Sequence, residues 1–155
     1  PQFHACQSPV SGPSNRCVQP LPPPDSFHLD AALGWMMLGN HAEALVELDR
    51  IEPARQLHPE ALELRWTIHA GQSDWRACLK TAQGLMDVAP DHVSGWVHRA
   101  YALRRLEGEG LDAAWNALLP AFDRFPDEII IPYNLACYAC QKNDLPAGRT
   151  WRWCS

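Results

Sequence analysis

The sequence contains no long apolar run and no targeting segment at its start. No stretch approaches the roughly 18 apolar residues that a membrane-spanning helix needs, and no basic segment followed by an apolar one opens the chain. We therefore expect a protein without a membrane partner. Because residue 1 is proline rather than methionine, the missing signal peptide says little about an earlier leader.

Cysteine is sparse, with six residues in a chain of 155. This number is too low for a disulfide scaffold, and three of the six fall inside segments with helical periodicity. A chain of this length can bury the core of one domain without disulfides or metal. The cysteine usage favours a reducing compartment, and we predict a cytoplasmic location.

Catalytic motifs are missing too. The chain has no Gly-x-Ser-x-Gly elbow, no phosphate-binding lysine loop and no His-Glu-x-x-His. Residues 108–113 match a dinucleotide fingerprint, but that motif follows a strand and here a helical pattern precedes it. The seven histidines show no ligand spacing within any one helix. We predict that the protein is not an enzyme and uses no cofactor and no metal.

Basic residues are too few in the front half of the chain for a nucleic-acid surface. The net charge is −5, and residues 25–58 carry six acidic against two basic side chains. Residues 59–92 carry five against three, and from residue 93 the charges balance. Phosphate binding needs a clustered basic surface, so nucleic acid is not an expected partner.

Residues 1–24 differ from the rest of the chain. They hold seven of the fourteen prolines and a single charged residue, Arg16. Such a composition predicts an extended, proline-rich arm. Phe3, Leu21 and Phe27 are the side chains expected to anchor it.

A repeat occupies the remainder. Asn40, Asp74, Gly110 and Asp144 each fall in a turn, at successive spacings of 34, 36 and 34 residues. Asparagine and aspartate at such places cap a following helix, because their side chains accept bonds from unpaired backbone N–H groups. Four residues after each turn residue comes a small one, which lets two helix backbones approach closely: Ala44, Cys78, Ala114 and Gly148.

Apolar residues at helical spacing between these turns predict eight helices. Pro53 interrupts the second, and Pro90 and Pro126 are expected to start first helices, where a missing N–H costs nothing. The expected ranges are 26–38, 41–56, 59–71, 74–88, 91–106, 110–124, 127–141 and 144–154.

The pattern resembles the tetratricopeptide repeat family, whose unit is a 34-residue helix–turn–helix. Trp96 with Ala100, and the run Tyr133 to Tyr138, resemble its first-helix signature. The resemblance implies an all-α, right-handed α-solenoid of about four repeats, at residues 25–58, 59–92, 93–128 and 129–155. The second repeat departs from the signature at Arg65 and Trp66, which suggests a helix rotated by one residue. We expect five tryptophans in the core or wedged between helices: Trp35, Trp66, Trp75, Trp96 and Trp115.

In stacked helical hairpins the first helices line a concave face, which is the expected site for a protein or peptide partner. Methionine, tyrosine and arginine are favourable contact residues there. The alternative for Arg104 and Arg105 is that they lie on a solvated face and pair with Glu107 and Glu109. The chaperone-clamping members of the family use lysine and asparagine where this chain has apolar residues, so that activity is not expected. The candidate groove residues are Met36, Met37, Tyr101, Arg104, Arg105, Tyr133 and Asn134.

Two alternative functions are indicated by other residues. The run Thr150–Trp151–Arg152–Trp153 ends the chain with no polar capping helix after it, so Trp151 and Trp153 are candidates for self-association into a homo-oligomer. Alternatively the two rings fold back onto the preceding helix. Cys137 and Cys140 share one helical face and could take part in metal or redox chemistry, although structural zinc needs four ligands.

Overall fold

The computed structural model describes residues 19–143. Predictions that fall on Phe3, on the eighth helix at 144–154 and on Trp151 and Trp153 lie outside these residues. The described chain forms seven α-helices and one short 3-10 helix, with no strand between residues 19 and 143. The elements are α1 (Asp25–Met37), α2 (His41–Asp49), η1 (Pro53–Arg55), α3 (Pro59–Gly71), α4 (Trp75–Val88), α5 (Val93–Arg105), α6 (Leu111–Arg124) and α7 (Ile130–Gln141).

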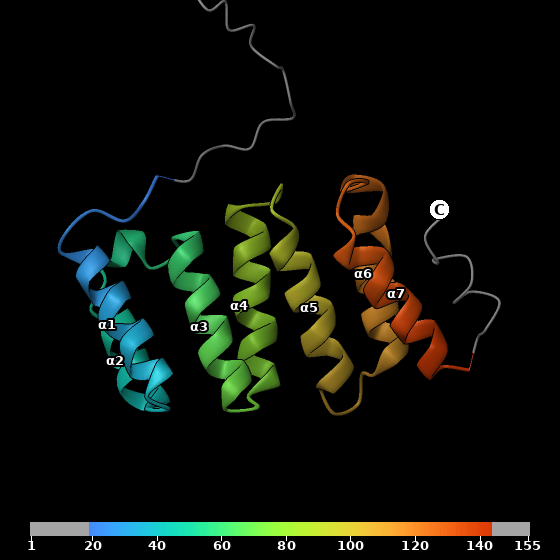
Figure 1. The fold of residues 1–155 in the computed structure, drawn as a ribbon, viewed down its shortest axis with the longest axis horizontal. Coiled ribbons are helices and arrows are strands. Elements are labelled where there is room, and N and C mark those ends of the chain that lie inside the picture. Colours follow the sequence, from blue (N-terminus) through green and yellow to red (C-terminus); the bar gives the residue numbers. More distant parts are fainter. Residues whose placement is uncertain (1–18, 144–155) are drawn as a thin grey trace, which may run out of the picture.

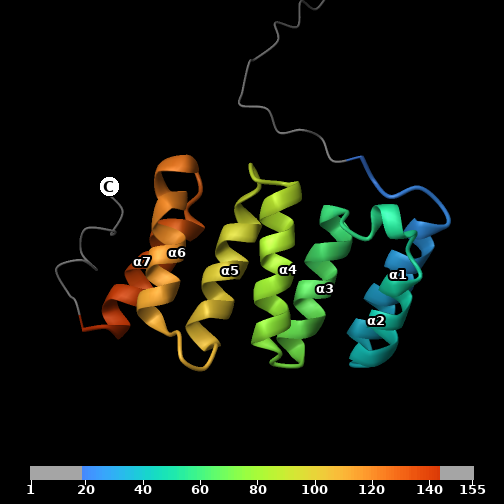
Figure 2. The same ribbon diagram turned by 180° about the vertical axis from the view of Figure 1, so that it is seen from behind.

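The helices lie side by side in a row that follows the order of the chain, with α1 and α7 at opposite ends (Figure 1). Seen from behind, α2 lies in front of α1 and α6 in front of α7 (Figure 2), so the helices of the first hairpin lie on opposite faces of the row. This arrangement is an all-α solenoid, as the repeat pattern predicted.

The turn residues act as the sequence indicated. The side-chain Oδ1 of Asn40 accepts a hydrogen bond from the Glu43 N–H at 3.3 Å, and the Oδ1 of Asp74 accepts one from the Ala77 N–H at 3.0 Å. The residue before each cap, Gly39 or Ser73, has a positive φ that ends the preceding helix. The first two hairpins are therefore closed by a local stop-and-cap signal, whereas Gly110 precedes α6 without a side-chain cap.

The small residues of the repeat are buried where the helices cross. Ala44, Cys78 and Ala114 have no exposed surface. Three apolar clusters follow the row, one shared by α1, α2 and α3, the next by α3, α4 and α5, and the last by α5, α6 and α7. Each hairpin thus buries its apolar side against its neighbours, as in solenoids generally.

Several helix ends differ from the sequence-based ranges. α2 ends at Asp49 rather than near residue 56, because Pro53 starts a separate 3-10 turn. α5 and α7 begin at Val93 and Ile130, two and three residues later than predicted. Turns bonded from Ala89 O to His92 N and from Phe125 O to Glu128 N come first, so the prolines at 90 and 126 precede these helices and do not start them.

Two anchoring predictions at the first hairpin are wrong. Phe27 is 65% exposed and Trp35 is 38% exposed, so neither is a core residue. Both lie on α1, whose apolar residues are spread around its whole circumference, and helical periodicity cannot say which side of such a helix is covered. Leu21 does anchor the chain before α1, since it is buried in the cluster shared by α1, α2 and α3.

The second repeat keeps its register. Trp66 is buried 34 residues after Ala32 and 34 residues before Ala100, and both alanines are fully buried in the repeats on either side. A rotation of α3 by one residue is therefore not needed. The large ring is accommodated because it stacks on His98 of α5, with ring centroids 3.9 Å apart.

Candidate binding groove

An open groove of about 800 Å³ lies between α1, α3 and the turn that joins α4 to α5. Its size falls in the range of about 300–1,000 Å³ that is usual for ligand-binding clefts. The groove is open to solvent, because Leu33 and Val88 on its surface are 43% and 42% exposed. Apolar side chains on its inner surface include Leu29, Leu33, Met36, Leu64 and Val88.

The groove exists because the first hairpin packs loosely on the second. α2 has nine residues against fourteen in α4 and α6, and it contacts α3 less extensively than α4 contacts α5. The 3-10 turn that replaces the end of α2 is held to the start of α1 instead. There the buried Asp25 accepts a hydrogen bond from the Glu52 N–H at 3.0 Å and pairs with Arg55.

These contacts fix the charge of Asp25. The hydrogen bond from the Glu52 backbone, followed by that from the Arg55 guanidinium, holds the pKa of the Asp25 carboxyl below its ordinary value. The ionised carboxylate therefore ties the first turn of α1 to the loop after α2. This tie sets the position of one wall of the groove.

The rim of the groove is acidic. Five carboxylates line it, with no lysine or arginine among the lining residues. Asp91 pairs with a residue outside the groove, because Arg124 Nη2 donates to its Oδ1 at 2.6 Å. Within residues 19–143, no ion pair involves Asp30 or Asp87. The five are Asp30, Glu60, Glu63, Asp87 and Asp91.

Glu63 connects the groove to α5. Its Oε2 accepts a hydrogen bond from His98 Nε2 at 2.6 Å, and its Oε1 accepts one from the Ser94 hydroxyl. Burial alone would raise the pKa of Glu63, but the two hydrogen bonds outweigh it and hold that pKa below its ordinary value. An ionised acceptor at Oε2 requires the proton of His98 to be on Nε2. Trp66 covers the other side of this contact by stacking on the same imidazole.

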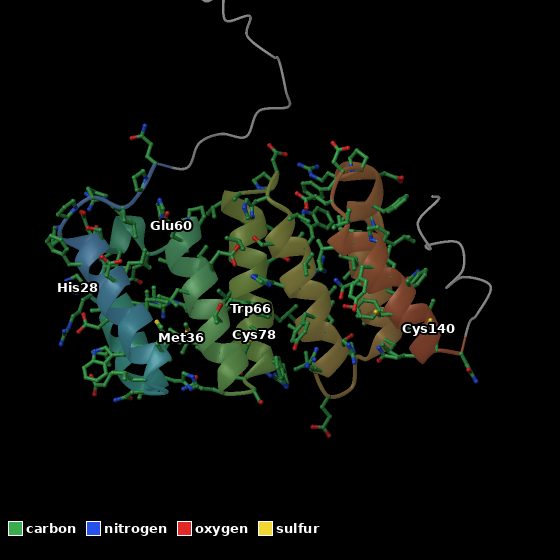
Figure 3. The ribbon with its side chains drawn as sticks, viewed as in Figure 1. His28, Met36, Glu60, Trp66, Cys78 and Cys140 are labelled. Carbon is green, nitrogen blue, oxygen red and sulfur yellow. The ribbon has the colours of Figure 1, made fainter. Side chains whose placement is uncertain are left out.

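Of the residues predicted for the groove, Met36 lines it. Figure 3 shows Met36 on the side of α1 that faces α3, with Glu60 near the start of α3. Met37 is 77% exposed and is not among the lining residues. The two neighbouring methionines therefore point to different surroundings.

Tyr101 and Arg105 form a second grouping, on α5. The Tyr101 ring meets Trp66 edge-on at 5.7 Å and Trp75 at 5.9 Å between centroids. The Arg105 guanidinium carbon lies 3.5 Å from the Tyr101 ring centroid. This cation–π contact gives Arg105 an intramolecular partner.

The other predicted site residues lie towards the end of the row. The Arg104 guanidinium carbon is 5.9 Å from the ring centroid of Tyr138, and neither Arg104 nor Arg105 pairs with Glu107 or Glu109 among the described residues. Tyr133 is 61% exposed on α7. Asn134 donates from its amide to the Ile130 carbonyl at 2.8 Å within the same helix.

The cysteines of α7 are free thiols, Cys137 partly buried and Cys140 exposed (Figure 3). Within residues 19–143, no three histidine, cysteine or acidic side chains are grouped so that they could hold a metal ion. Burial raises the pKa of the Cys78 thiol to about 11, so that group stays protonated and unreactive near neutral pH.

The helical hairpins, their caps and their shared clusters define the molecule as a tetratricopeptide-like helical repeat. Two solved structures share its fold, and both are 17% identical in sequence with a TM-score of 0.69. One is described as MamA 41-end from Desulfovibrio magneticus RS-1, and the match covers 82% of this chain and 71% of that one. The other is described as a MamA RS-1 ArsTM double mutant, with coverage of 83% and 71%.

No protein-family model matches the chain, and no curated protein does either. None of the helices between residues 19 and 143 is long and apolar enough to cross a bilayer.

Met36, predicted from the sequence, lines the groove, but the carboxylates contributed by α4 and by the turn after it were not predicted. Asp87 and Asp91 lie in the second helix and the following turn, so a search along first helices does not find them. The excess of acidic residues in 25–92 was the available signal.

Proposed function

We propose that the chain is a scaffold that binds a segment of another protein along the groove between α1 and α3. The observation that supports this most directly is the apolar surface of the groove, which is partly exposed at Leu33 and Val88. Exposed apolar surface of this kind, rimmed by polar residues, typically marks an interaction site. Neither catalysis nor a cofactor is part of the proposal, and a cytoplasmic location remains a prediction.

The Tyr101–Arg105 cluster and Tyr133 are proposed as a second contact region further along the row. Aromatic and arginine side chains dominate many protein interfaces. Since Tyr101 also packs on Trp66 and Trp75, Tyr101→Ala would lower stability as well as any binding. Leu33 is a better probe, because its exposed side chain can be changed at little cost to the core.

The test is co-purification with the intact chain from its native cell, repeated with Leu33→Asp. The matched control is Leu119→Asp, because Leu119 is 39% exposed on α6, away from the groove. We expect the same proteins to be retained by the wild-type chain and by Leu119→Asp, and lost with Leu33→Asp. Equal retention by all three chains would contradict the proposal.

A second candidate function is self-association through the ends of the row. Apolar side chains are exposed at the first helix, on Phe27 and Trp35, and at the last described helix, on Ile129 and Tyr133. This alternative predicts association that grows with protein concentration and does not depend on Leu33.

A further inference from the structure

The charges around the groove restrict what can bind there. We infer that the groove between α1 and α3 takes a basic, apolar segment of a partner protein, in which lysine or arginine side chains flank an apolar face. This inference rests on the proposed function, since it names the chemistry of the segment that the same groove would hold.

The apolar side chains of the groove recur at helical intervals along α1. Leu29, Leu33 and Met36 follow one another at intervals of four and three residues along α1, so they form one ridge. Leu64 of α3 and Val88 at the end of α4 face the same space. An amphipathic segment laid along such a groove inserts apolar side chains at matching intervals. The apolar surface therefore supplies affinity without selecting a charge.

The selection of charge comes from the rim. Asp30 stands on the α1 wall and Glu60 on the α3 wall, so carboxylates border the groove on both sides. Asp87 and Asp91 close its end. With no lysine or arginine on the lining, cationic side chains of a bound segment reduce the repulsion among these carboxylates, whereas acidic ones increase it. A free carboxylate terminus of a partner is disfavoured for the same reason.

The carboxylates differ in their availability. Asp91 pairs with Arg124 and Glu63 is occupied by His98 and Ser94. Glu60 has His58 at 3.8 Å, and Asp30 has no ion-pair partner within residues 19–143. Asp87 has no ion pair among the described residues either, but its Oδ1 accepts a hydrogen bond from Gln83 Nε2 at 2.9 Å. Asp30 and Glu60 lie on the two opposing walls of the groove, so reversal of their charges is the most informative change.

The experiment uses two synthetic peptides with the same leucine pattern, one with lysine and one with glutamate at every polar position. Their affinities for the full chain are measured by fluorescence anisotropy at low and high salt. We expect the lysine peptide to bind, to bind more weakly at high salt because ions screen the rim, and to bind at least about tenfold more tightly than the glutamate peptide.

Two charge-reversal variants locate the effect. Asp30→Lys/Glu60→Lys should weaken binding of the lysine peptide about tenfold, on the basis of roughly one exposed ion pair lost at each position. The control is Glu107→Lys/Glu109→Lys, which changes the net charge equally at the exposed turn between α5 and α6. Equal weakening in both variants would show a general charge effect and overturn the inference.

The remaining outcomes separate this inference from the proposed function. If both peptides bind alike and lose affinity with Leu33→Asp, the groove binds polypeptides but its charge does not select them, and only this inference fails. If neither peptide binds, the proposed use of the groove fails with it. If a peptide of residues 144–155, which carries Arg149 and Arg152, displaces the lysine peptide and the chain self-associates, the occupant is a second copy and the partner assignment is overturned.

Discussion

The approach of α4 to α5 depends on a glycine, and replacing it should move the two helices apart. Gly95 is buried on α5, and a Cβ added there would lie 2.8 Å from Met86 Cγ and 3.2 Å from the Met86 backbone nitrogen. A distance of 2.8 Å is shorter than real Cβ contacts, and 3.2 Å is tighter than most of them. The Met86 side chain can rotate, but its backbone nitrogen can move only with α4. Gly95→Ala therefore forces a shift of one helix against the other.

The expected loss of stability follows from a comparison with Gly84 on α4. A Cβ at Gly84 would meet only Leu62 Cδ1, at 3.9 Å, which is ordinary contact. Gly84→Ala gains about 0.5–1 kcal/mol because alanine favours a helix interior over glycine, and Gly95→Ala, in the first turn of α5, gains no more than that. Only Gly95→Ala also incurs the overpacking cost of about 1–3 kcal/mol. The two variants should therefore differ by about 1–3 kcal/mol, with Gly84→Ala more stable than the wild-type chain.

Urea denaturation followed by circular dichroism measures this difference, and thermal unfolding checks it. For a chain of this size each kcal/mol moves the Tm by about 2–4 °C. Gly95→Ala should have a lower midpoint than Gly84→Ala by several degrees. If Gly95→Ala stabilises the chain as much as Gly84→Ala does, α4 and α5 do not approach as described and the reasoning is refuted.

Three further predictions concern other parts of the chain. Ala114→Trp should cost about 1–3 kcal/mol or more, because Ala114 is fully buried between helices, whereas Glu109→Ala in an exposed turn should hardly move the unfolding midpoint; equal shifts would mean that the repeat is mis-phased. Asp25 has a folded pKa below its unfolded pKa of about 3.9, so its contribution to the free energy of unfolding is present above that pH and is lost as the pH falls through the folded value. Asp25→Asn should therefore be less stable than the wild-type chain at pH 7, and the difference in stability should narrow below about pH 4. A difference that does not change with pH would contradict this. Light scattering should show association that Trp151→Ser and Trp153→Ser reduce, and a monomer at high concentration whose stability ignores both changes would exclude a role for these residues in self-association.

The repeat architecture could be read from the sequence because its signals are local. Asn40 and Asp74 cap the helices that follow them, and Ala44, Cys78 and Ala114 recur at the positions where backbones approach. Each signal depends on a few consecutive residues, so it needs no knowledge of the neighbouring repeat.

The groove could not be predicted from such local signals, because it depends on how the first two hairpins pack against each other. Pro53 was recognised as an interruption, but its effect on the gap between α1 and α3 depends on tertiary packing. The stack of Trp66 on His98 likewise joins residues of different repeats. For Phe27 and Trp35 the reason is different, since apolar residues all around α1 leave its covered side undetermined.

The location of the binding site can be measured through the methionine methyl groups. The chain has three methionines, and they report three places: Met36 lines the groove, Met37 is exposed outside it, and Met86 packs beside Gly95 between α4 and α5. The ¹³C-methyl signals are assigned by single Met→Leu variants and followed as the lysine peptide is added. We predict that the Met36 signal shifts in a saturable manner while those of Met37 and Met86 stay in place. A saturable shift of Met37 with Met36 unchanged would contradict binding in the groove between α1 and α3.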